Sequence, residues 1–266
     1  MNIQKFLPSP RLRPYIKQYY LAEGNLGKKT QDVFFADGCL EVVFNLDLTF
    51  YRNNQIEPWA KLIGQITEPL HVEAKGQGKS FGIWFTPHGF SMFSDIPVKA
   101  LNDQAIPLGD IFHDAFIDAV GSHLERNETE RLIGTINHYF EALLSKSVNA
   151  FKEKVTNYAV EQITHPRLDF SLNSLAKNCN VSNRYLQKIF AESIGLSPKK
   201  LQRVFRFQHV LQKLSRAGKT ELTALAYEAG YADQSHFIRE FKTFTNFTPS
   251  QYQQHSHPIN QYFINA

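Results

Sequence analysis

Apolar side chains recur at helical spacing in the C-terminal part of the chain, and residues 225–252 show this pattern most clearly. A first helical pattern ends at Gly230, because glycine readily adopts the left-handed backbone that closes a helix. A second pattern starts almost at once and places Phe237 and Phe241 four residues apart on one face. Two short helices joined by a tight glycine turn are typical of a helix-turn-helix unit.

The same pattern occurs a second time, about 50 residues upstream. The pair Leu175-Ala176 matches Leu225-Ala226 at an offset of 50 residues, and Phe190 matches Phe241 at an offset of 51. The other matches are Val181 with Tyr231, Leu186 with Phe237 and Pro198 with Pro249. One residue is therefore inserted in the second copy, at the start of its outer helix. A repeat of this kind predicts two copies of one structural unit.

A long helix is expected to join the two copies. Pro198 suits the first turn of a helix, and an apolar stripe follows it through Leu201, Val204, Phe205, Leu211 and Leu214. At ~1.5 Å per residue this helix is about 25 Å long. Once the widths of the two units are added, it can separate them by roughly the ~34 Å between successive major-groove faces of DNA.

The N-terminal half has a different pattern, since short runs of β-branched and aromatic residues alternate with turn signals. The expected strands are 33–35, 40–44, 49–51, 55–56, 61–66, 70–74 and 80–86. Turn pairs favour hairpins at Asp37-Gly38 and Asn53-Asn54, and helices are expected at 111–124 and 128–144. The fold class is therefore α+β: an antiparallel sandwich or small barrel with helices, followed by an all-α domain of two helix-turn-helix units.

Composition is that of an ordinary globular protein, with 42% hydrophobic and 20% charged residues among 266. Charge is uneven: residues 1–150 hold 14 Lys+Arg against 17 Asp+Glu, and residues 151–266 hold 15 against 8. The C-terminal half therefore suits an anionic partner such as nucleic acid, although a surplus of this size also arises by chance. Two distant cysteines, Cys39 and Cys179, and the lack of a signal-peptide or bilayer-spanning pattern predict a cytoplasmic protein.

The N-terminal half has no recognisable catalytic or metal-binding set. His71 and His88 lack a metal-binding spacing and are expected to be hydrogen-bonded structural histidines. Trp59 and Trp84 are expected in the core rather than in a ligand pocket. We therefore expect no enzyme activity, no cofactor and no metal, whereas a small barrel often encloses one small ligand.

The C-terminal half resembles a known family over residues 151–252. In the second copy the motif residues are Leu225-Ala226, Gly230-Tyr231, Asp233, Ser235-His236-Phe237, Arg239, Phe241-Lys242, Thr248-Pro249 and Tyr252. In the first copy and the joining helix they are Ser182, Leu186, Phe190, Gly195, Ser197-Pro198, Arg203 and Arg206. They are similar to the DNA-binding domain of AraC/XylS-type bacterial transcription regulators. Asn246 stands where that family has glycine, and asparagine also tolerates left-handed geometry.

The resemblance implies that the second helix of each unit enters a major groove. The implied base-contacting residues are Arg184, Gln187, Lys188, Gln234, Ser235, His236 and Arg239. The residues implied to contact phosphate are Lys199, Lys200, Arg203 and Lys242. Arg and Lys suit guanine and Gln suits adenine, whereas phosphate contacts set register and affinity. The arginine at the Arg239 position is structural or phosphate-binding in parts of the family, so both roles stay open. We expect the first copy to read bases more strictly, because the inserted residue shifts the outer helix of the second.

The resulting interpretation is a sequence-specific regulator that binds double-stranded promoter DNA through adjacent major grooves. Weaker likeness to sensor regions, at residues 14–16, 37–38 and 81–90, implies that a small effector acts on the N-terminal domain. In the alternative, that domain only forms a homodimer, with helix 128–144 as a contact, or binds RNA polymerase. An enzyme with a DNA-binding tether is disfavoured, because no catalytic set is visible.

The expected division has three parts. Residues 1–147 form the sensor or dimerisation domain, and residues 148–256 form the DNA-binding domain. A polar segment, residues 145–149, joins them. Residues 257–266 form a C-terminal tail, and His255 and His257 are expected to be solvated rather than to bind a metal.

Overall fold

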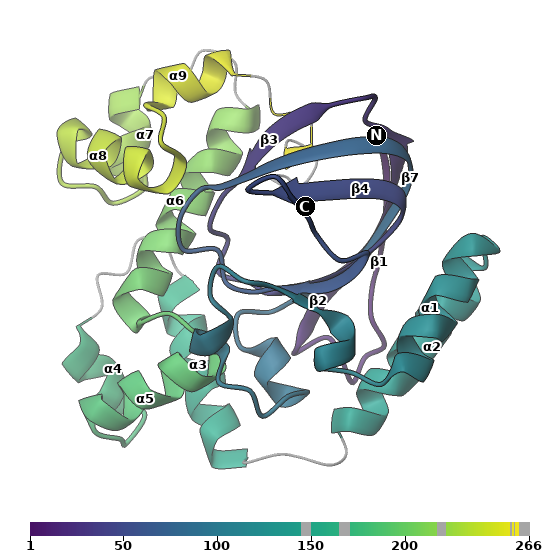
Figure 1. The fold of residues 1–266 in the computed structure, drawn as a ribbon. Helices are drawn as coiled ribbons and strands as arrows, with labels where there is room; N and C mark the ends of the chain where they lie inside the picture. Colours follow the sequence, from purple (N-terminus) through teal and green to yellow (C-terminus); the bar gives the residue numbers. More distant parts are fainter. Residues whose placement is uncertain (145–149, 165–170, 217–221, 256, 258, 261–266) are drawn as a thin grey trace.

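A computed structural model of the chain describes residues 1–144, 150–164, 171–216, 222–255, 257 and 259–260. Segment 145–149, which we expected to join the two halves, lies outside them. The described residues form a β-rich half followed by an all-α half, which confirms the predicted fold class (Figure 1). No helix in these ranges is long and apolar enough to cross a membrane.

The described strands of the first half form one antiparallel sheet that curls round on itself (Figure 1). They are β1 (Asn2–Phe6), β2 (Ile16–Asn25), β3 (Thr30–Phe34), β4 (Glu41–Arg52), β5 (Gln55–Ile56), β6 (Ala60–Ile63), β7 (Leu70–Phe85) and β8 (Ala105–Pro107). The main order is β1-β2-β7-β4-β6-β8, with β3 beside β7 and β5 beside β4. Strand β7 is thus the centre, because it pairs with β2, β3 and β4.

Strand β7 is one long strand, whereas the sequence predicted two, at 70–74 and 80–86. The two glycines between those segments allow a close backbone approach. A Cβ on Gly78 would lie 2.1 Å from the carbonyl oxygen of Leu46, and a Cβ on Gly76 would lie 2.4 Å from that of Asp47. Strands β4 and β7 can therefore pair this closely only because these positions lack side chains.

One predicted hairpin is confirmed and one is wrong. Asn53 and Asn54 join β4 to β5 with φ of 50° and 63°, the positive values that a two-residue hairpin requires. Strands β3 and β4 are not paired with each other, since both pair with β7. The Asp37 carboxyl instead accepts hydrogen bonds from the Cys39 N–H at 3.0 Å and the Trp84 indole at 2.9 Å.

Helices α1 (Asp114–Glu125) and α2 (Thr129–Leu144) cover the core of this half. Short 3₁₀ turns η1 (Gly89–Met92), η2 (Val98–Leu101) and η3 (Leu108–Asp110) precede them. Leu132, Ile136 and Phe140 of α2 are buried in that core, so its apolar face packs on its own domain, one of the two predicted alternatives.

Two expectations for single residues in this half are wrong. Trp84 is buried as predicted, but 46% of Trp59 is exposed. His88 is buried, yet neither ring nitrogen has a hydrogen-bond partner among the described residues. Burial alone lowers the pKa of His88 to about 4, so the ring is neutral near pH 7.

The second half consists of helices in the described ranges, and the two predicted helix-turn-helix units and the long helix that joins them are confirmed. The helices are α3 (Ala150–Thr164), α4 (Leu172–Asn178), α5 (Asn183–Ser193), α6 (Pro198–Arg216), α7 (Leu222–Glu228), α8 (Gln234–Thr245) and α9 (Pro249–Gln254). Helix α6 runs between the unit that contains α4 and α5 and the unit that contains α7 and α8 (Figure 1). Val204, Phe207 and Leu211 on α6 are buried in a core that both units share.

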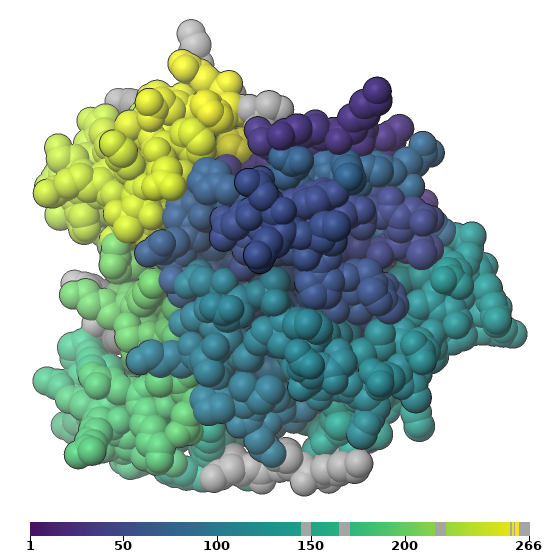
Figure 2. Space-filling model, viewed as in Figure 1, coloured from purple at the N-terminus to yellow at the C-terminus, as the bar shows by residue number. Residues whose placement is uncertain are grey.

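The two halves pack directly on each other, as the contiguous surface in Figure 2 illustrates. Phe35 and Ala36, which follow β3, belong to the core of the helical half. The Gln208 side chain of α6 donates to the Ala36 carbonyl at 2.6 Å, and the Asn102 side chain donates to the Gly195 carbonyl at 2.9 Å. The β-rich half thus contacts the first unit and the joining helix.

The expected solvated tail is also wrong for the part that the structure describes. His257 is only 9% exposed and Ile259 only 1% exposed, and both lie against the β-rich half. His255 stays exposed, as predicted.

Candidate nucleic-acid interface

The two helical units close their turns with the same backbone hydrogen bonds. The N–H of Val181 donates to the Ala176 carbonyl at 3.0 Å, and the N–H of Tyr231 donates to the Ala226 carbonyl at 3.0 Å. Asn180 and Gly230, one residue earlier, have φ of 54° and 76°. Both turns therefore use a left-handed residue to end the first helix, as a helix-turn-helix requires.

The inserted residue of the second unit lies in its turn. Ser182 caps α5 by accepting the Tyr185 N–H at 3.1 Å, and Asp233 caps α8 by accepting the His236 N–H at 2.7 Å. Because Val181 leads directly into its cap whereas Tyr231 does not, the additional residue is Ala232. Helix α8 therefore starts after a longer turn than α5 does.

Helix α5 has one buried and one exposed face. The predicted base-contacting residues lie on the exposed face. Leu186, Ile189 and Phe190 are buried in the shared core. Arg184, Gln187 and Lys188 are exposed on the other side. The Lys188 ammonium lies 3.8 Å from the Glu192 carboxyl, and 68% of the Lys188 side chain is exposed. Because such an exposed ion pair is weak, Lys188 can still reach a DNA groove.

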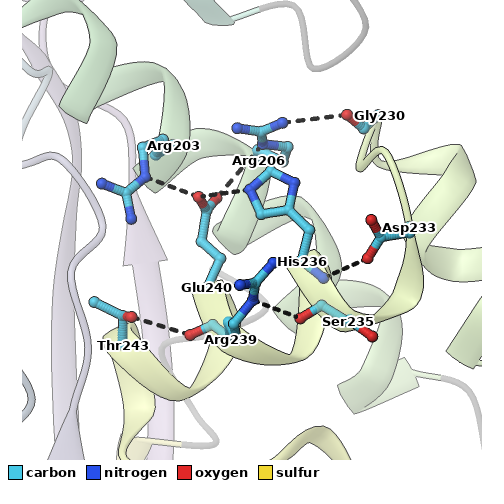
Figure 3. Close-up of polar contacts among 9 residues, drawn as sticks. All are labelled: Arg203, Arg206, Gly230, Asp233, Ser235, His236, Arg239, Glu240 and Thr243. Atoms are coloured by element: carbon cyan, nitrogen blue, oxygen red, sulfur yellow. Dashed lines mark hydrogen bonds and ion pairs between the residues drawn. The ribbon is translucent and has the colours of Figure 1, made fainter.

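Helix α8 is built in the same way, but its polar residues have more internal contacts. Phe237, Phe241 and Phe244 are buried, and the predicted reading residues Gln234, Ser235 and Arg239 are exposed. The Gln234 side chain accepts from Thr223 at 3.2 Å. The Arg239 Nε donates to the Ser235 carbonyl at 3.4 Å (Figure 3). His236 is partly exposed and turns toward Glu240, 3.8 Å away.

Glu240, which the sequence did not single out, is the centre of a buried polar cluster (Figure 3). Its side chain is only 4% exposed and pairs with Arg203 at 2.8 Å and with Arg206 at 3.6 Å, both from α6. Arg206 also donates to the Gly230 carbonyl at 3.2 Å and lies 4.6 Å from the centre of the Tyr231 ring. Burial, followed by the charge of Glu240, raises the pKa of Tyr231. The cluster fastens α8 and its turn to the joining helix.

The predicted phosphate-contacting residues are not equivalent in their surroundings. Lys199 and Lys242 are exposed, and Lys200 is partly exposed at the start of α6. Arg203 differs, since its guanidinium pairs with Glu240 and lies 5.6 Å from the Phe244 ring. The sequence does contain a signal for this pairing, because Glu240 is an acidic residue on an otherwise apolar helix face.

Metal-binding and nucleophilic features are weak in the described residues. No group of three or more His, Cys, Asp or Glu side chains there could hold a metal ion. Burial, followed by the charge of Asp37, raises the pKa of Cys39 well above its usual value, so its thiol stays protonated and unreactive near pH 7.

Comparisons with known proteins match each half separately. Residues 175–255 match a family model described as a helix-turn-helix domain, and residues 4–107 match a domain of unknown function (DUF6597). An uncharacterized HTH-type transcriptional regulator of Haemophilus influenzae is 31% identical over 106 residues, which make up 40% of this chain and 35% of that protein. One from Staphylococcus aureus is 27% identical over 143 residues, 50% of this chain and 19% of the relative. The matched stretches thus span about a third or less of these curated relatives.

A likeness to a solved structure covers more of the chain. ToxT from Vibrio cholerae is 12% identical, and the alignment covers 89% of this chain and 98% of that chain with a TM-score of 0.45.

Proposed function

Because the chain belongs to the AraC/XylS family of helix-turn-helix proteins, we propose that it regulates transcription by binding a specific double-stranded DNA site. Helices α5 and α8 would each enter a major groove, one helical turn of DNA apart. The observation that carries the proposal is the pair of units whose first helices end with the same backbone hydrogen bond and whose second helices have exposed polar faces.

Base reading is assigned mainly to α5 in this proposal. Arg184 and Lys188 suit guanine and Gln187 suits adenine, and in the structure these side chains make few internal contacts. On α8, Gln234, Ser235 and His236 are the proposed readers, and Arg239 remains open between base and phosphate. Lys199, Lys200 and Lys242 are the proposed phosphate contacts, whereas Arg203, which was also expected to contact phosphate, is proposed to hold Glu240 instead.

Substitutions can separate the two roles. Arg184→Ala or Gln187→Ala should weaken binding to the specific site by about 1–3 kcal/mol, because a bidentate base contact is lost. Lys200→Ala should instead weaken binding to all sequences and reduce the salt slope by about one, since one phosphate contact disappears. Affinities measured by fluorescence anisotropy at several salt concentrations, for specific and scrambled duplexes, report both effects.

Arg131→Ala and Lys28→Ala are matched controls, because both residues are exposed on the β-rich half. They should bind DNA as the unsubstituted protein does. The base-reading assignment fails if Arg184→Ala and Gln187→Ala keep full discrimination between the two duplexes. The phosphate assignment fails if Lys200→Ala alters sequence preference at an unchanged salt slope.

Response to a small effector is also proposed for the β-rich half. It is supported by a small cavity inside the curled sheet, lined in part by Tyr20, Glu41, Phe50 and Lys61. Under the alternative, this half only dimerises or binds RNA polymerase. We also propose a cytoplasmic location, a choice supported by Cys39 and Cys179, which are both free thiols.

A further inference from the structure

The last described residues, His257, Ile259 and Asn260, fold back onto the β-rich half, and we call these three residues the clasp. The Asp32 carboxyl on β3 accepts the N–H of Ile259 at 2.6 Å and the N–H of Asn260 at 2.8 Å. The Asn260 side chain donates to the Val33 carbonyl at 2.7 Å. The Asp32 side chain is fully buried, so these bonds satisfy an acceptor that water cannot reach.

The Ile259 side chain fills an apolar hollow next to these bonds. It packs with Leu26, Leu48 and Ala74 in a small cluster that is separate from the main core of this half. We call Asp32, Val33, Leu26, Leu48 and Ala74 the clasp site. In the folded chain this site therefore binds a branched aliphatic side chain, that of Ile259, and two neighbouring backbone N–H donors.

Ile259 also lines the cavity inside the sheet, together with Tyr20, Glu41, Phe50 and Lys61. This cavity has a volume of only about 70 Å³. Sites for small molecules usually measure roughly 300–1,000 Å³. Withdrawal of Ile259, one of the lining side chains, would enlarge this cavity.

The clasp is connected to the second helix-turn-helix unit with little intervening chain. The His257 ring stacks on Tyr252 of α9 with centroids 4.4 Å apart, and it also contacts Phe35 of the β-rich half. Tyr252 in turn packs on Phe241 of α8 at 5.7 Å. Through His257, the clasp is thus one contact away from α9 and two from α8.

We propose that the clasp site is a regulatory site, occupied internally by Ile259 and Asn260, where a competing ligand releases the clasp and so loosens the second unit against the β-rich half. The effect on DNA binding rests on the proposed function, whereas the docking of the clasp does not. The ligand must replace the donors to Asp32, because a buried acceptor without a partner is costly. An aliphatic amine or amide meets this requirement, whereas an aliphatic carboxylate places like charge against Asp32.

Docking of the clasp favours DNA binding. Gln234 and Ser235 on α8 and Arg184 and Gln187 on α5 are exposed while the clasp is docked, so it does not cover the reading surfaces. It adds a restraint on the second unit to those that the shared core and the Glu240 cluster already provide. Release allows that unit more freedom, which must be lost again when both units bind DNA.

Ile259→Asp in the full chain is the central variant, because an acid beside Asp32 in an apolar hollow expels the clasp. Its matched control is Ile56→Asp, since Ile56 is 69% exposed at the tip of the β4–β5 hairpin. A second variant, Asp32→Asn, weakens the two N–H bonds without changing the hollow, and Asp118→Asn is its exposed control.

Hydrogen exchange measures the docking of the clasp in the absence of DNA. The amides of Ile259 and Asn260 should be protected in the unsubstituted protein, and Ile259→Asp and Asp32→Asn should remove this protection while both controls keep it. Equal exchange in Ile259→Asp and Ile56→Asp would overturn the proposal.

DNA affinity measures how docking of the clasp affects DNA binding. On a duplex with both half-sites, Ile259→Asp should bind at least about fivefold more weakly than Ile56→Asp, which is the lower end of typical coupling between sites. On a duplex with only the half-site for α5, the two should bind equally. An equal loss on both duplexes would contradict a role in positioning the second unit. If the unsubstituted protein binds all duplexes equally, the proposed function fails. The hydrogen-exchange result on clasp docking still stands in that case.

Ligand chemistry is tested on Ile259→Asp, where the clasp site is vacant. L-Isoleucinamide at millimolar concentration should raise its Tm by about 2 °C or more, because a ligand of the folded state stabilises that state. 3-Methylpentanoate, which has the same branched carbon skeleton and a carboxylate but no N–H donor, should not. Equal shifts with both compounds, or no shift with either, would refute the assigned ligand class.

Discussion

At the scale of single residues, Glu240 decides how the second unit is held. Its carboxyl interrupts the apolar face formed by Phe237, Phe241 and Phe244 and is 4% exposed. A buried acid is tolerated only with partners, and Arg203 and Arg206 provide them from α6. The unit is therefore fixed to the joining helix by charge as well as by apolar packing.

Glu240→Gln should lower the free energy of unfolding by about 2–3 kcal/mol. Removing one partner of a buried ion pair costs about 3–5 kcal/mol, and the partial exposure of Arg203 reduces this effect. Urea denaturation of the full chain measures the change. Glu125→Gln, at an exposed position on α1, should change stability by less than about 0.5 kcal/mol. Similar stabilities for the two variants would show that the cluster contributes little.

Residues whose role is local were predictable from the sequence. Gly230 ends its helix with φ of 76°, and Asn246 takes the left-handed conformation with φ of 63° in place of the family glycine. Glu240 was missed because its role depends on two arginines from another helix. The same tertiary contact gives Arg203 an ion pair that its sequence position did not indicate.

At the scale of elements, helices were easier to predict than strands. Each helix of the second half buries its own apolar stripe, and this periodicity is visible within the segment itself. Strands depend on which neighbour they pair with. The Asp37-Gly38 pair favoured a hairpin, but β7 separates β3 from β4 in the sheet, and no local pattern shows this.

Gly38 matters at this scale because it lies where the sheet meets α6. Its φ is 81°, and a Cβ there would lie 3.1 Å from Leu201 Cδ1. Gly38→Ala should therefore lower the free energy of unfolding by about 1–2 kcal/mol, the cost of a left-handed non-glycine residue. Thermal and urea unfolding report the change.

Gly134→Ala is the matched control for this prediction. Gly134 lies inside α2, and a Cβ there meets no atom within 4 Å. The substitution should raise stability by about 0.5–1 kcal/mol, because alanine favours the helix more than glycine does. If both variants change stability with the same sign, the left-handed requirement at Gly38 does not control the packing of the sheet against α6.

At the scale of the whole molecule, the internal repeat predicted the bipartite helical half. The contacts between the halves were not predictable, because they join positions far apart in sequence. Gln208 bonds to Ala36 across 172 residues, and Ile259 bonds to Asp32 across 227. Their residue types are common, and only the folded chain brings them together. The expectation of a solvated tail failed for this reason.

The central claim, two units reading adjacent major grooves, is tested most directly by selecting bound sequences from random DNA with the full chain. We expect two recognised blocks with centres about 10 base pairs apart, the repeat of one helical turn. Arg184→Ala should relax the block read by α5 and leave the other block intact. Insertion of five base pairs between the blocks should reduce affinity to that of a single block, because the units then face opposite sides of the duplex. A single recognised block, or full affinity after the insertion, would contradict the account.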